Sequence, residues 1–512
     1  MGSKRRVFAA AILLCVIFFA EGLAFIRQVG LQEDEVQFVA AVLPPLVGRK
    51  FLEVGDNLIP VMIATYAGSL KALAYSGLFY LWPPSTWSIR IPVLVVGSIA
   101  IFLFFVFFRM VMGDLAAFIA TALLVVDPVF VLLTVLDSGI VVVQHFLLAA
   151  ALPLFVHFHR TGRRAALALA CFLCGLALWD KATFVWILGG LGAGALLFFY
   201  REIRPHLSVR NLAFALLWVV AGALPLVYYT VASWSEANSG MGGYQAPTLH
   251  KVAILEKSLD GSSMFDLLTG PSVAAQARRP KTVLERASVW LSERAGNPRR
   301  HALKWACIVS ILLIPFLGPL RRRMAFCLVA FAVGWLLMLP FAMGGNGSHH
   351  VVLLWPLPQM LVASAACGVA AWFPRARAGI AWTLAAPVLL TSLLVLNQVH
   401  AQETVFGTPR FWTDAIYPLQ RLLETSRAAG IYALDWGIEG PLRTLGQGRL
   451  PLERSTTPRF QRRLFIYYVD RSGLGGESLA RMRELGREEL VAEVADRNGR
   501  PVYRVVRFKA AQ

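Results

Sequence analysis

Long apolar runs recur along the chain, and they constrain its fold more than any other feature of the sequence. A transmembrane helix needs about twenty consecutive, mostly apolar residues, and the chain contains about eleven such runs. Apolar residues make up 57% of the sequence and charged residues only 15%, which an ordinary soluble domain does not match. We therefore expect a mainly α-helical, polytopic membrane protein. The predicted spans cover residues 7–27, 90–109, 115–135, 139–158, 165–179, 182–200, 211–231, 302–319, 324–343, 350–372 and 378–397.

The positions of the basic residues predict the topology. The net charge is +19, but a nucleic-acid binder gathers its basic residues on one water-facing surface. Here most basic clusters lie in short connections between apolar runs, and such connections stay in the cytoplasm. We therefore exclude nucleic acid as a partner, and we place the N-terminus in the cytoplasm and the C-terminus outside. The basic connections carry Arg109; Arg160, Arg163 and Arg164; Arg201, Arg204 and Arg210; Arg321, Arg322 and Arg323; and Arg375 and Arg377.

Two long external loops are predicted, over residues 28–89 and 232–300. The first contains an apolar segment, residues 59–82, which resembles a further span. A span there would place every later arginine cluster outside the cytoplasm, against the usual bias. We therefore expect one or two amphipathic helices that lie on the outer membrane surface.

The chain divides into a predicted transmembrane domain, residues 1–400, and an external soluble domain, residues 401–512. The second part alternates helical and strand-like patterns, so we expect a small α/β domain. The predicted elements are a helix over 412–427, strands over 431–434 and 464–469, and a hairpin that turns at Asn498-Gly499.

Acidic residues at the outer ends of the spans are candidates for a functional site, because charge at membrane depth is costly. Glu33-Asp34-Glu35 follows the first span, and three adjacent carboxylates repel one another. A nearby cation or a raised pKa is expected for at least one of them. Asp137 lies in the next external turn, and Asp180-Lys181 lies in a third. The structural alternatives are a helix cap at Glu33-Asp34-Glu35, an ordinary turn at Asp137 and a local ion pair between Asp180 and Lys181.

Cationic and histidine side chains occur at the same predicted level. Lys71 and Arg90 lie around the surface segment, and His349 and His350 follow a glycine-rich turn at residues 344–348. This turn is compatible with binding phosphate, coordinating a metal or simply linking two helices. Two adjacent histidines rarely face one ion, so a divalent metal is not indicated and no cofactor is predicted.

The order of these features resembles the GT-C superfamily of membrane glycosyltransferases, in particular the branch of protein O-mannosyltransferases and the aminoarabinose transferase of lipid A. The resemblance covers about residues 5–400. The motifs that carry it are Asp34-Glu35, Tyr66-Ala67-Gly68-Ser69-Leu70-Lys71, Ser88-Ile89-Arg90-Ile91-Pro92, Asp137-Ser138-Gly139, Trp179-Asp180-Lys181-Ala182 and, more loosely, the run from Gly344 to Pro356.

The resemblance implies that a sugar is transferred, with inversion, from a polyprenyl-phosphate or polyprenyl-diphosphate carrier to an acceptor outside a bacterial-type inner membrane. A positioned carboxylate can take the proton of an acceptor hydroxyl, and Asp34 is the expected base, with Glu35 orienting Asp34 or the acceptor. Cationic groups would stabilise the departing phosphate. The substrate-binding residues that the resemblance implies are Lys71, Arg90, Asp137, Lys181, His349 and His350.

Two other classes of protein remain as alternatives. A transporter or flippase of a lipid-linked or phosphorylated substrate also needs many spans, but the sequence shows no repeated halves. A non-catalytic membrane protein that binds partners through residues 401–512 would not need Asp34. The sugar, the carrier length and the acceptor, whether glycan, lipid or protein, are left open because a fold does not determine a substrate.

Overall fold

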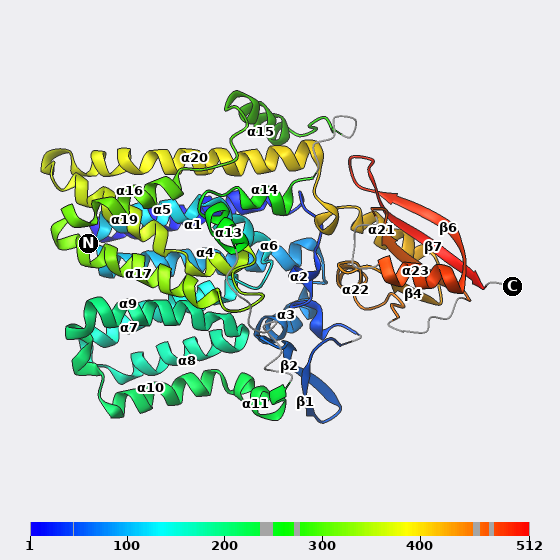
Figure 1. Cartoon of the computed structure of the whole chain (residues 1–512), viewed down its shortest axis with the longest axis horizontal. Coiled ribbons are helices and arrows are strands. Elements are labelled where there is room, and N and C mark those ends of the chain that lie inside the picture. The colour runs from blue at the N-terminus through cyan, green and yellow to red at the C-terminus, as the bar shows by residue number, and fades with distance from the viewer. Residues whose placement is uncertain are drawn as a thin grey trace.

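The computed structural model describes residues 2–44, 46–235, 249–270, 277–453, 461–470 and 476–510. These residues form a bundle of long helices with the N-terminus at one end (Figure 1). A unit that contains a β-sheet covers the opposite end of the bundle. The predicted fold class, a mainly helical membrane protein with a small C-terminal α/β part, is confirmed.

Five helices in the described part of the chain are long and apolar enough to cross a membrane, and up to nine spans result if each of four bent helix pairs counts as one. The chain is therefore an integral membrane protein. The five are α1 (Gly2–Phe25), α4 (Thr86–Met112), α7 (Val142–Thr161), α9 (Val185–Ile203) and α20 (Arg377–Phe406). The pairs are α5 (Asp114–Val125) with α6 (Pro128–Leu136), α10 (Val209–Gly222) with α11 (Leu224–Ala232), α16 (Leu303–Leu313) with α17 (Arg321–Met338), and α18 (Ser348–Val351) with α19 (Leu357–Ala370).

The predicted number of eleven spans stays a prediction. α8 (Arg164–Asp180) has 17 residues, which is at the lower limit of about 17 for a span. The helices of α16 and α17 meet at 116°, so they run in different directions and are not one straight span. Short 3₁₀ turns join or extend these helices at Ala40–Val42, Ala182–Phe184, Arg204–His206, Ile314–Phe316, Gly318–Leu320, Val352–Leu354, Pro374–Ala376 and Arg410–Trp412.

Proline and its neighbours explain the bend between α5 and α6. Pro128 occupies the first turn of α6, where its missing N–H is not needed. Asp127 caps the same helix, because its Oδ1 accepts a hydrogen bond from the backbone N–H of Phe130 at 2.9 Å. The Asp127-Pro128 pair therefore starts a helix.

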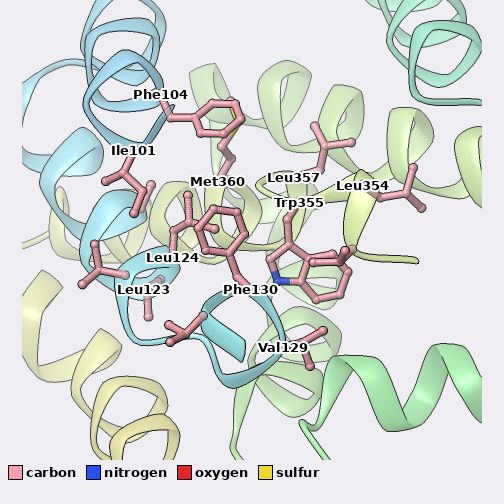
Figure 2. Packing of buried hydrophobic residues seen from close by; sticks show 14 of the residues in the cluster. Ile101, Phe104, Leu123, Leu124, Val129, Phe130, Leu354, Trp355, Leu357 and Met360 are labelled. Atoms are coloured by element: carbon pink, nitrogen blue, oxygen red, sulfur yellow. The ribbon is translucent and has the colours of Figure 1, made fainter. Parts of the chain in front are cut away.

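Close packing holds the centre of the bundle together. Figure 2 shows Phe104, Phe130 and Trp355 among aliphatic side chains of α4, α5, α6 and α19. Phe130 and Trp355 are almost fully buried, with exposed fractions of 1% and 0%. Within a bilayer the lipid tails are as apolar as the side chains, so dispersion contacts rather than water exclusion stabilise such packing. This core fixes α6, whose outer end carries Asp137.

The surface segment at residues 59–82 is only partly as predicted. Its second half forms the helix α3 (Leu70–Leu81), but its first half is strand β2 (Asn57–Ala64), so the helix prediction there is wrong. β2 pairs with β1 (Lys50–Val54) and β3 (Ala67–Gly68). The reason is local: Gly55, at φ +58°, makes a two-residue hairpin turn, and Pro60 disfavours a helix.

The segment over residues 232–300, predicted to be the second external loop, contains three described helices, α13 (Leu249–Leu259), α14 (Ser263–Leu268) and α15 (Val283–Arg294). α15 begins with a capping box, in which Thr282 accepts from the backbone N–H of Glu285 at 3.1 Å. It then packs beside α20, because Asn397 Nδ2 donates to the carbonyl of Ser288 at 2.9 Å. The loop is therefore attached to the outer part of α20.

The C-terminal unit has the elements that the sequence predicted. A four-stranded sheet runs in the order β4-β5-β7-β6, with β4 and β5 parallel and the other neighbours antiparallel. Its hairpin turns at Gly499, whose φ of +80° suits glycine. The elements are α21 (Ile416–Thr425), β4 (Gly430–Ala433), α22 (Glu439–Leu445), β5 (Arg463–Tyr468), α23 (Gly476–Leu485), β6 (Gly486–Ala495) and β7 (Pro501–Ala510).

Candidate active site

The three adjacent carboxylates of the first loop lie on one short helix, α2 (Glu33–Val36). Gln32 caps this helix, because its side-chain oxygen accepts from the backbone N–H of Asp34 at 2.7 Å. Successive residues of a helix point in different directions, so Glu33, Asp34 and Glu35 have three different surroundings. The structure therefore gives different surroundings to three carboxylates that are adjacent in the sequence.

Glu35 forms a buried ion pair with Arg90 of α4. Arg90 donates from Nε and Nη2 to the two carboxylate oxygens at 2.6 and 2.8 Å. Its remaining N–H groups donate to the carbonyls of Ile26, Val29 and Gly30 at 2.7 to 2.8 Å. A guanidinium has five N–H donors, and all five of Arg90 are used here. Arg90, expected to bind substrate, instead fixes the chain that joins α1 to α2.

Glu33 contacts the C-terminal unit. Its Oε2 accepts a hydrogen bond from the backbone N–H of Gly440 in α22 at 2.9 Å. Burial raises the pKa of Glu33 to about 7, although the Gly440 bond and the charge of Arg443 oppose the shift. Glu33 is thus held between the first loop and the sheet-containing unit.

Asp34 has the weakest hydrogen bonds of the three carboxylates. Among the described residues, its oxygens accept only from the side-chain amides of Gln32 and Gln37, each at 3.3 Å, and the residue is partly exposed. Burial raises its pKa, while the Gln32 bond and the positive charge of Lys181 oppose the shift. A carboxylate held only by long bonds is more available to a substrate proton than one fixed in an ion pair.

Lys71 and Asp137 form a second buried ion pair. The ammonium of Lys71, in the first turn of α3, lies 2.5 Å from Oδ2 of Asp137. Asp137 ends α6 in the left-handed region, at φ +43°. Its other oxygen accepts from the backbone N–H groups of Val141 and Val142 at 2.8 and 3.0 Å, at the start of α7. Asp137 therefore joins two helices to the first loop.

Lys181 lies beside this pair. Its ammonium donates to the carbonyl of Gly139 at 2.5 Å and lies 6.0 Å from the centre of the Tyr66 ring. A backbone hydrogen bond of 2.9 Å from Ala182 to Tyr66 fixes the first loop next to it. Burial lowers the pKa of Lys181 to about 8, while the charges of Asp180, Asp34 and Asp137 oppose the shift. Lys181 is thus a cation that is in charge contact with Asp34 and Asp137.

Asp180 does not pair with Lys181, contrary to the local ion pair suggested by their adjacency. Its exposed fraction is 1%, and within the described residues neither carboxylate oxygen has a hydrogen-bond partner. The charges nearest to it belong to Asp137, Lys71 and Lys181. A buried carboxylate without a partner is costly, so Asp180 adds an unbalanced acidic group to this cluster.

The two adjacent histidines have different positions. His349 packs against Gly139, where an added Cβ would lie 2.6 Å from its ring. His350 is turned toward α9, and its ring lies edge-on to Trp186 with centroids 5.7 Å apart. His349 therefore lies beside the turn whose Gly139 carbonyl binds Lys181, whereas His350 packs against Trp186. Among the residues that the structure describes, no group of three or more His, Cys, Asp or Glu could hold a metal ion.

The site residues therefore fall into two groups. Lys71, Asp137, Lys181 and His349 meet around the turn at residues 137–139, and Asp34 reaches this group through the charge of Lys181. Arg90 and Glu35 fix the chain that leads into α2, and His350 packs against Trp186 of α9. Tyr66, which lies against Lys181, was not among the predicted site residues. Its place in the motif that ends at Lys71 was the available signal.

Such an arrangement, with charged side chains gathered at one end of a helix bundle, defines a polytopic membrane protein with a polar site at its surface. No family model matches the chain, and no curated protein sequence matches it significantly. Several solved structures nevertheless match most of its length. ArnT from Cupriavidus metallidurans bound to undecaprenyl phosphate is 12% identical, covers 98% of this chain and 98% of its own, and has a TM-score of 0.54.

The apo state of the same ArnT is 12% identical, covers 99% of this chain and 98% of its own, and has a TM-score of 0.56. An oligosaccharyltransferase from Archaeoglobus fulgidus with a tethered acceptor peptide is 13% identical and covers 87% of this chain and 63% of its own, with a TM-score of 0.48. Because the identities are so low, the two ArnT matches show the fold alone. The chain has the fold of these ArnT structures, as the sequence resemblance predicted.

Proposed function

We propose that this protein transfers a sugar from a polyprenyl-phosphate-linked donor to an acceptor on the external side of the membrane, with Asp34 as the base. The observation that carries the proposal is the state of Asp34. Glu35 is fixed by Arg90 and Glu33 accepts from Gly440, whereas the side chain of Asp34 makes only two bonds of 3.3 Å within the described residues. It is the carboxylate of α2 best suited to accept a proton.

The fold supports a lipid-linked donor. The matching ArnT structure was solved bound to undecaprenyl phosphate, so one protein with this fold holds a polyprenyl phosphate. Such a lipid keeps its chain in the bilayer and brings its phosphate to the membrane surface. The cluster around Lys181 lies where the helix bundle meets the first loop, because Lys181 follows α8 and pairs with Ala67 of β3. Donor and acceptor can meet at this level.

The proposed step is a direct displacement. The oxygen of the acceptor hydroxyl attacks the anomeric carbon and gives its proton to Asp34. The bond from that carbon to the phosphate oxygen breaks, and the electron pair leaves with the phosphate. Attack from the side opposite the leaving group inverts the anomeric configuration. The charge that develops on the phosphate needs a cation, and preorganised charges of this kind are often the largest contribution to catalysis.

Lys181 is the proposed phosphate partner. Its ammonium is bound to one carbonyl and to no carboxylate in the described structure, whereas Lys71 is held by Asp137. Lys71 adds positive charge to the site through its position at Asp137, and His349 offers a further contact beside Gly139. Arg90 and Glu35 are assigned a supporting role, because every donor of Arg90 is already used within the chain.

The proposed location is a bacterial-type inner membrane with the N-terminus in the cytoplasm. Figure 1 supports opposite sides for the two ends of the chain, since α1 begins at one end of the bundle and the C-terminal unit covers the other. α20 begins at Arg377 near the first of these ends, just after Arg375. Basic residues at that end favour a cytoplasmic assignment.

Membranes from a deletion strain provide the test. Lipid extracts of this strain should contain an accumulated polyprenyl-phosphate sugar, and the wild-type gene should remove it while Asp34→Asn should not. Purified wild-type protein, added to such membranes loaded with radiolabelled donor, should then consume the labelled lipid. Movement of the labelled lipid across the bilayer without consumption would instead identify a flippase and overturn the proposal.

A further inference from the structure

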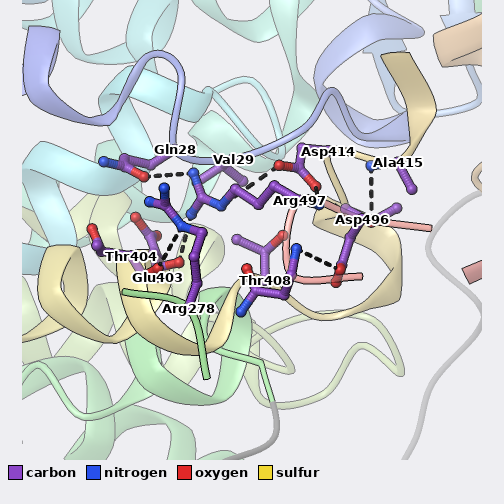
Figure 3. Close-up of polar contacts among 12 residues, drawn as sticks. Gln28, Val29, Arg278, Glu403, Thr404, Thr408, Asp414, Ala415, Asp496 and Arg497 are labelled. Atoms are coloured by element: carbon purple, nitrogen blue, oxygen red, sulfur yellow. Dashed lines mark hydrogen bonds and ion pairs between the residues drawn. The ribbon is translucent and has the colours of Figure 1, made fainter. Parts of the chain in front are cut away.

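The turn between β6 and β7, residues 496–500, contacts the end of α20 (Figure 3). The last carbonyls of a helix lack partners within it, and positive charge near them is favourable. Here Arg497 donates to the carbonyl of Glu403, and Asn498 Nδ2 donates to that of Val405 at 2.8 Å. Arg500 donates to the carbonyl of Thr408 just beyond the helix. The turn therefore caps α20 with side chains of the C-terminal unit.

Arg497 also reaches the first loop. One terminal nitrogen donates to Gln28 Oε1 at 2.7 Å, while the other binds the carbonyl of Glu403. Asp414 holds the arginine in place, because its Oδ1 accepts from the backbone N–H of Arg497 at 3.1 Å and its Oδ2 lies 3.6 Å from Nε. Gln28 is fixed in turn, with its Nε2 3.0 Å from His400 Nε2. Arg497 thus bridges the C-terminal unit, α20 and the chain that leads to Asp34.

That same chain touches the C-terminal unit at two more points. The backbone N–H of Gly30 donates to the carbonyl of Trp412 at 2.8 Å, and Glu33 accepts from Gly440. The contact at Gly30 is tight, since an added Cβ would lie 1.9 Å from the carbonyl oxygen of Thr413. On its other side, the chain is bound by Arg90. Residues 26–35 are therefore bound by α4 on one side and by the C-terminal unit on the other.

We propose that Arg497 is a positioning residue, through which the C-terminal unit holds the chain that carries Asp34 in its reactive position. This inference rests on the proposed transferase function. A general base must lie within hydrogen-bond reach of the proton that it takes. A displacement of about 1 Å can lower a rate by about 100-fold, so a loop held at both ends is advantageous. The C-terminal unit is then part of the catalytic machinery of the membrane domain.

The test compares Arg497→Gln and Gln28→Ala, alone and combined, with Arg500→Gln as the matched control. Arg500 lies in the same turn and also binds a carbonyl near the end of α20, but it makes no described contact with residues 26–35. Each variant is studied as the full chain in lipid nanodiscs. We measure turnover per inserted molecule with a labelled polyprenyl-phosphate sugar, and amide hydrogen exchange of residues 26–35 by mass spectrometry.

In Arg497→Gln and Gln28→Ala, kcat should fall about 10- to 100-fold with little change in the donor KM. The double variant should be no worse than Arg497→Gln, because both changes break one contact. Exchange of residues 26–35 should become faster in these variants and stay unchanged in Arg500→Gln.

Wild-type turnover and exchange in Arg497→Gln would overturn the proposal, and so would equal losses in Arg500→Gln. Multiplied losses in the double variant would also contradict it, because they would mean that Arg497 and Gln28 act independently. If the wild-type protein transfers no sugar, the proposed function fails. The exchange of residues 26–35 then decides alone whether Arg497 holds this chain in place.

Discussion

The ammonium of Lys71 lies 2.5 Å from Oδ2 of Asp137, and the exposed fractions of the two side chains are only 3% and 0%. Because Oδ1 of the same aspartate binds the start of α7, one carboxylate connects the surface helix α3 with two membrane helices. A lysine held in this way is less free to move toward a substrate than the sequence suggested. The main role of the Lys71–Asp137 pair is therefore to link these helices, and its contribution of charge to the site is secondary.

Removing one member of this pair should destabilise the protein. Breaking a buried ion pair leaves an uncompensated charge and costs about 3–5 kcal/mol. We expect Lys71→Met to lower the free energy of unfolding by this amount. Asn at position 137 keeps the oxygen that binds Val141 and Val142, so the double variant Lys71→Met/Asp137→Asn should recover part of the loss. Unfolding in mixed detergent micelles measures the effect, and simple additivity of the two changes would contradict it.

Asp34→Asn should leave folding intact and remove most of the turnover. The substitution keeps the size of the side chain and one acceptor oxygen for its long amide bonds, but it removes the basic oxygen. General base catalysis contributes about 10²- to 10⁴-fold, so kcat should fall by at least the lower factor. The measurement is turnover per inserted molecule at saturating donor. Glu35→Gln is the comparison, because loss of its charge next to Arg90 should reduce the amount of folded protein instead.

The sequence alone predicted a mainly helical membrane protein, because long apolar runs follow directly from the properties of a bilayer. It also indicated Asp34, Lys71, Asp137 and Lys181 as candidates through their order along the chain. It could not show that Arg90 is fully used inside the protein. That outcome depends on the carbonyls of Ile26, Val29 and Gly30, which every residue possesses and no sequence pattern marks.

The strand β2 shows a second limit of the sequence. Its run Val61-Met62-Ile63 suits a buried helix or a buried strand, and periodicity cannot distinguish the two in so short a segment. A distant helix also contacts this strand, because Trp179 of α8 donates from Nε1 to the carbonyl of Val61 at 3.0 Å. The Gly55 turn was the local signal that was missed.

The predicted topology can be tested with a single cysteine. Glu489→Cys lies in β6 of the C-terminal unit at a side chain with an exposed fraction of 51%. A membrane-impermeant thiol reagent should label it in intact spheroplasts. Five of the six native cysteines are buried, and Cys15, partly exposed within α1, lies in the bilayer, so the unmodified protein should react little. Labelling only after membrane disruption would place the C-terminal unit in the cytoplasm and reverse the topology.

The pH dependence of transfer should report the charge contact between Asp34 and Lys181. A base acts when it is unprotonated, so kcat/KM should fall as pH drops through the pKa of Asp34. Since burial raises this pKa, the acid limb should lie above the value of about 3.9 for an ordinary aspartate. The positive charge of Lys181 opposes the shift, so its removal should raise the pKa of Asp34 further.

The decisive comparison is therefore Lys181→Met against Lys181→Arg. In Lys181→Met, the residual activity should show an acid limb at higher pH than in the wild type. Lys181→Arg keeps the charge, so its acid limb should stay near that of the wild type. On the alkaline side, the pKa of Lys181 is lowered to about 8, and wild-type activity should fall as this lysine loses its proton. In Lys181→Arg, that alkaline fall should disappear, because arginine stays protonated throughout this range. Identical acid limbs in the wild type and Lys181→Met would show that Lys181 does not influence the base, and they would remove Asp34 or Lys181 from the proposed mechanism.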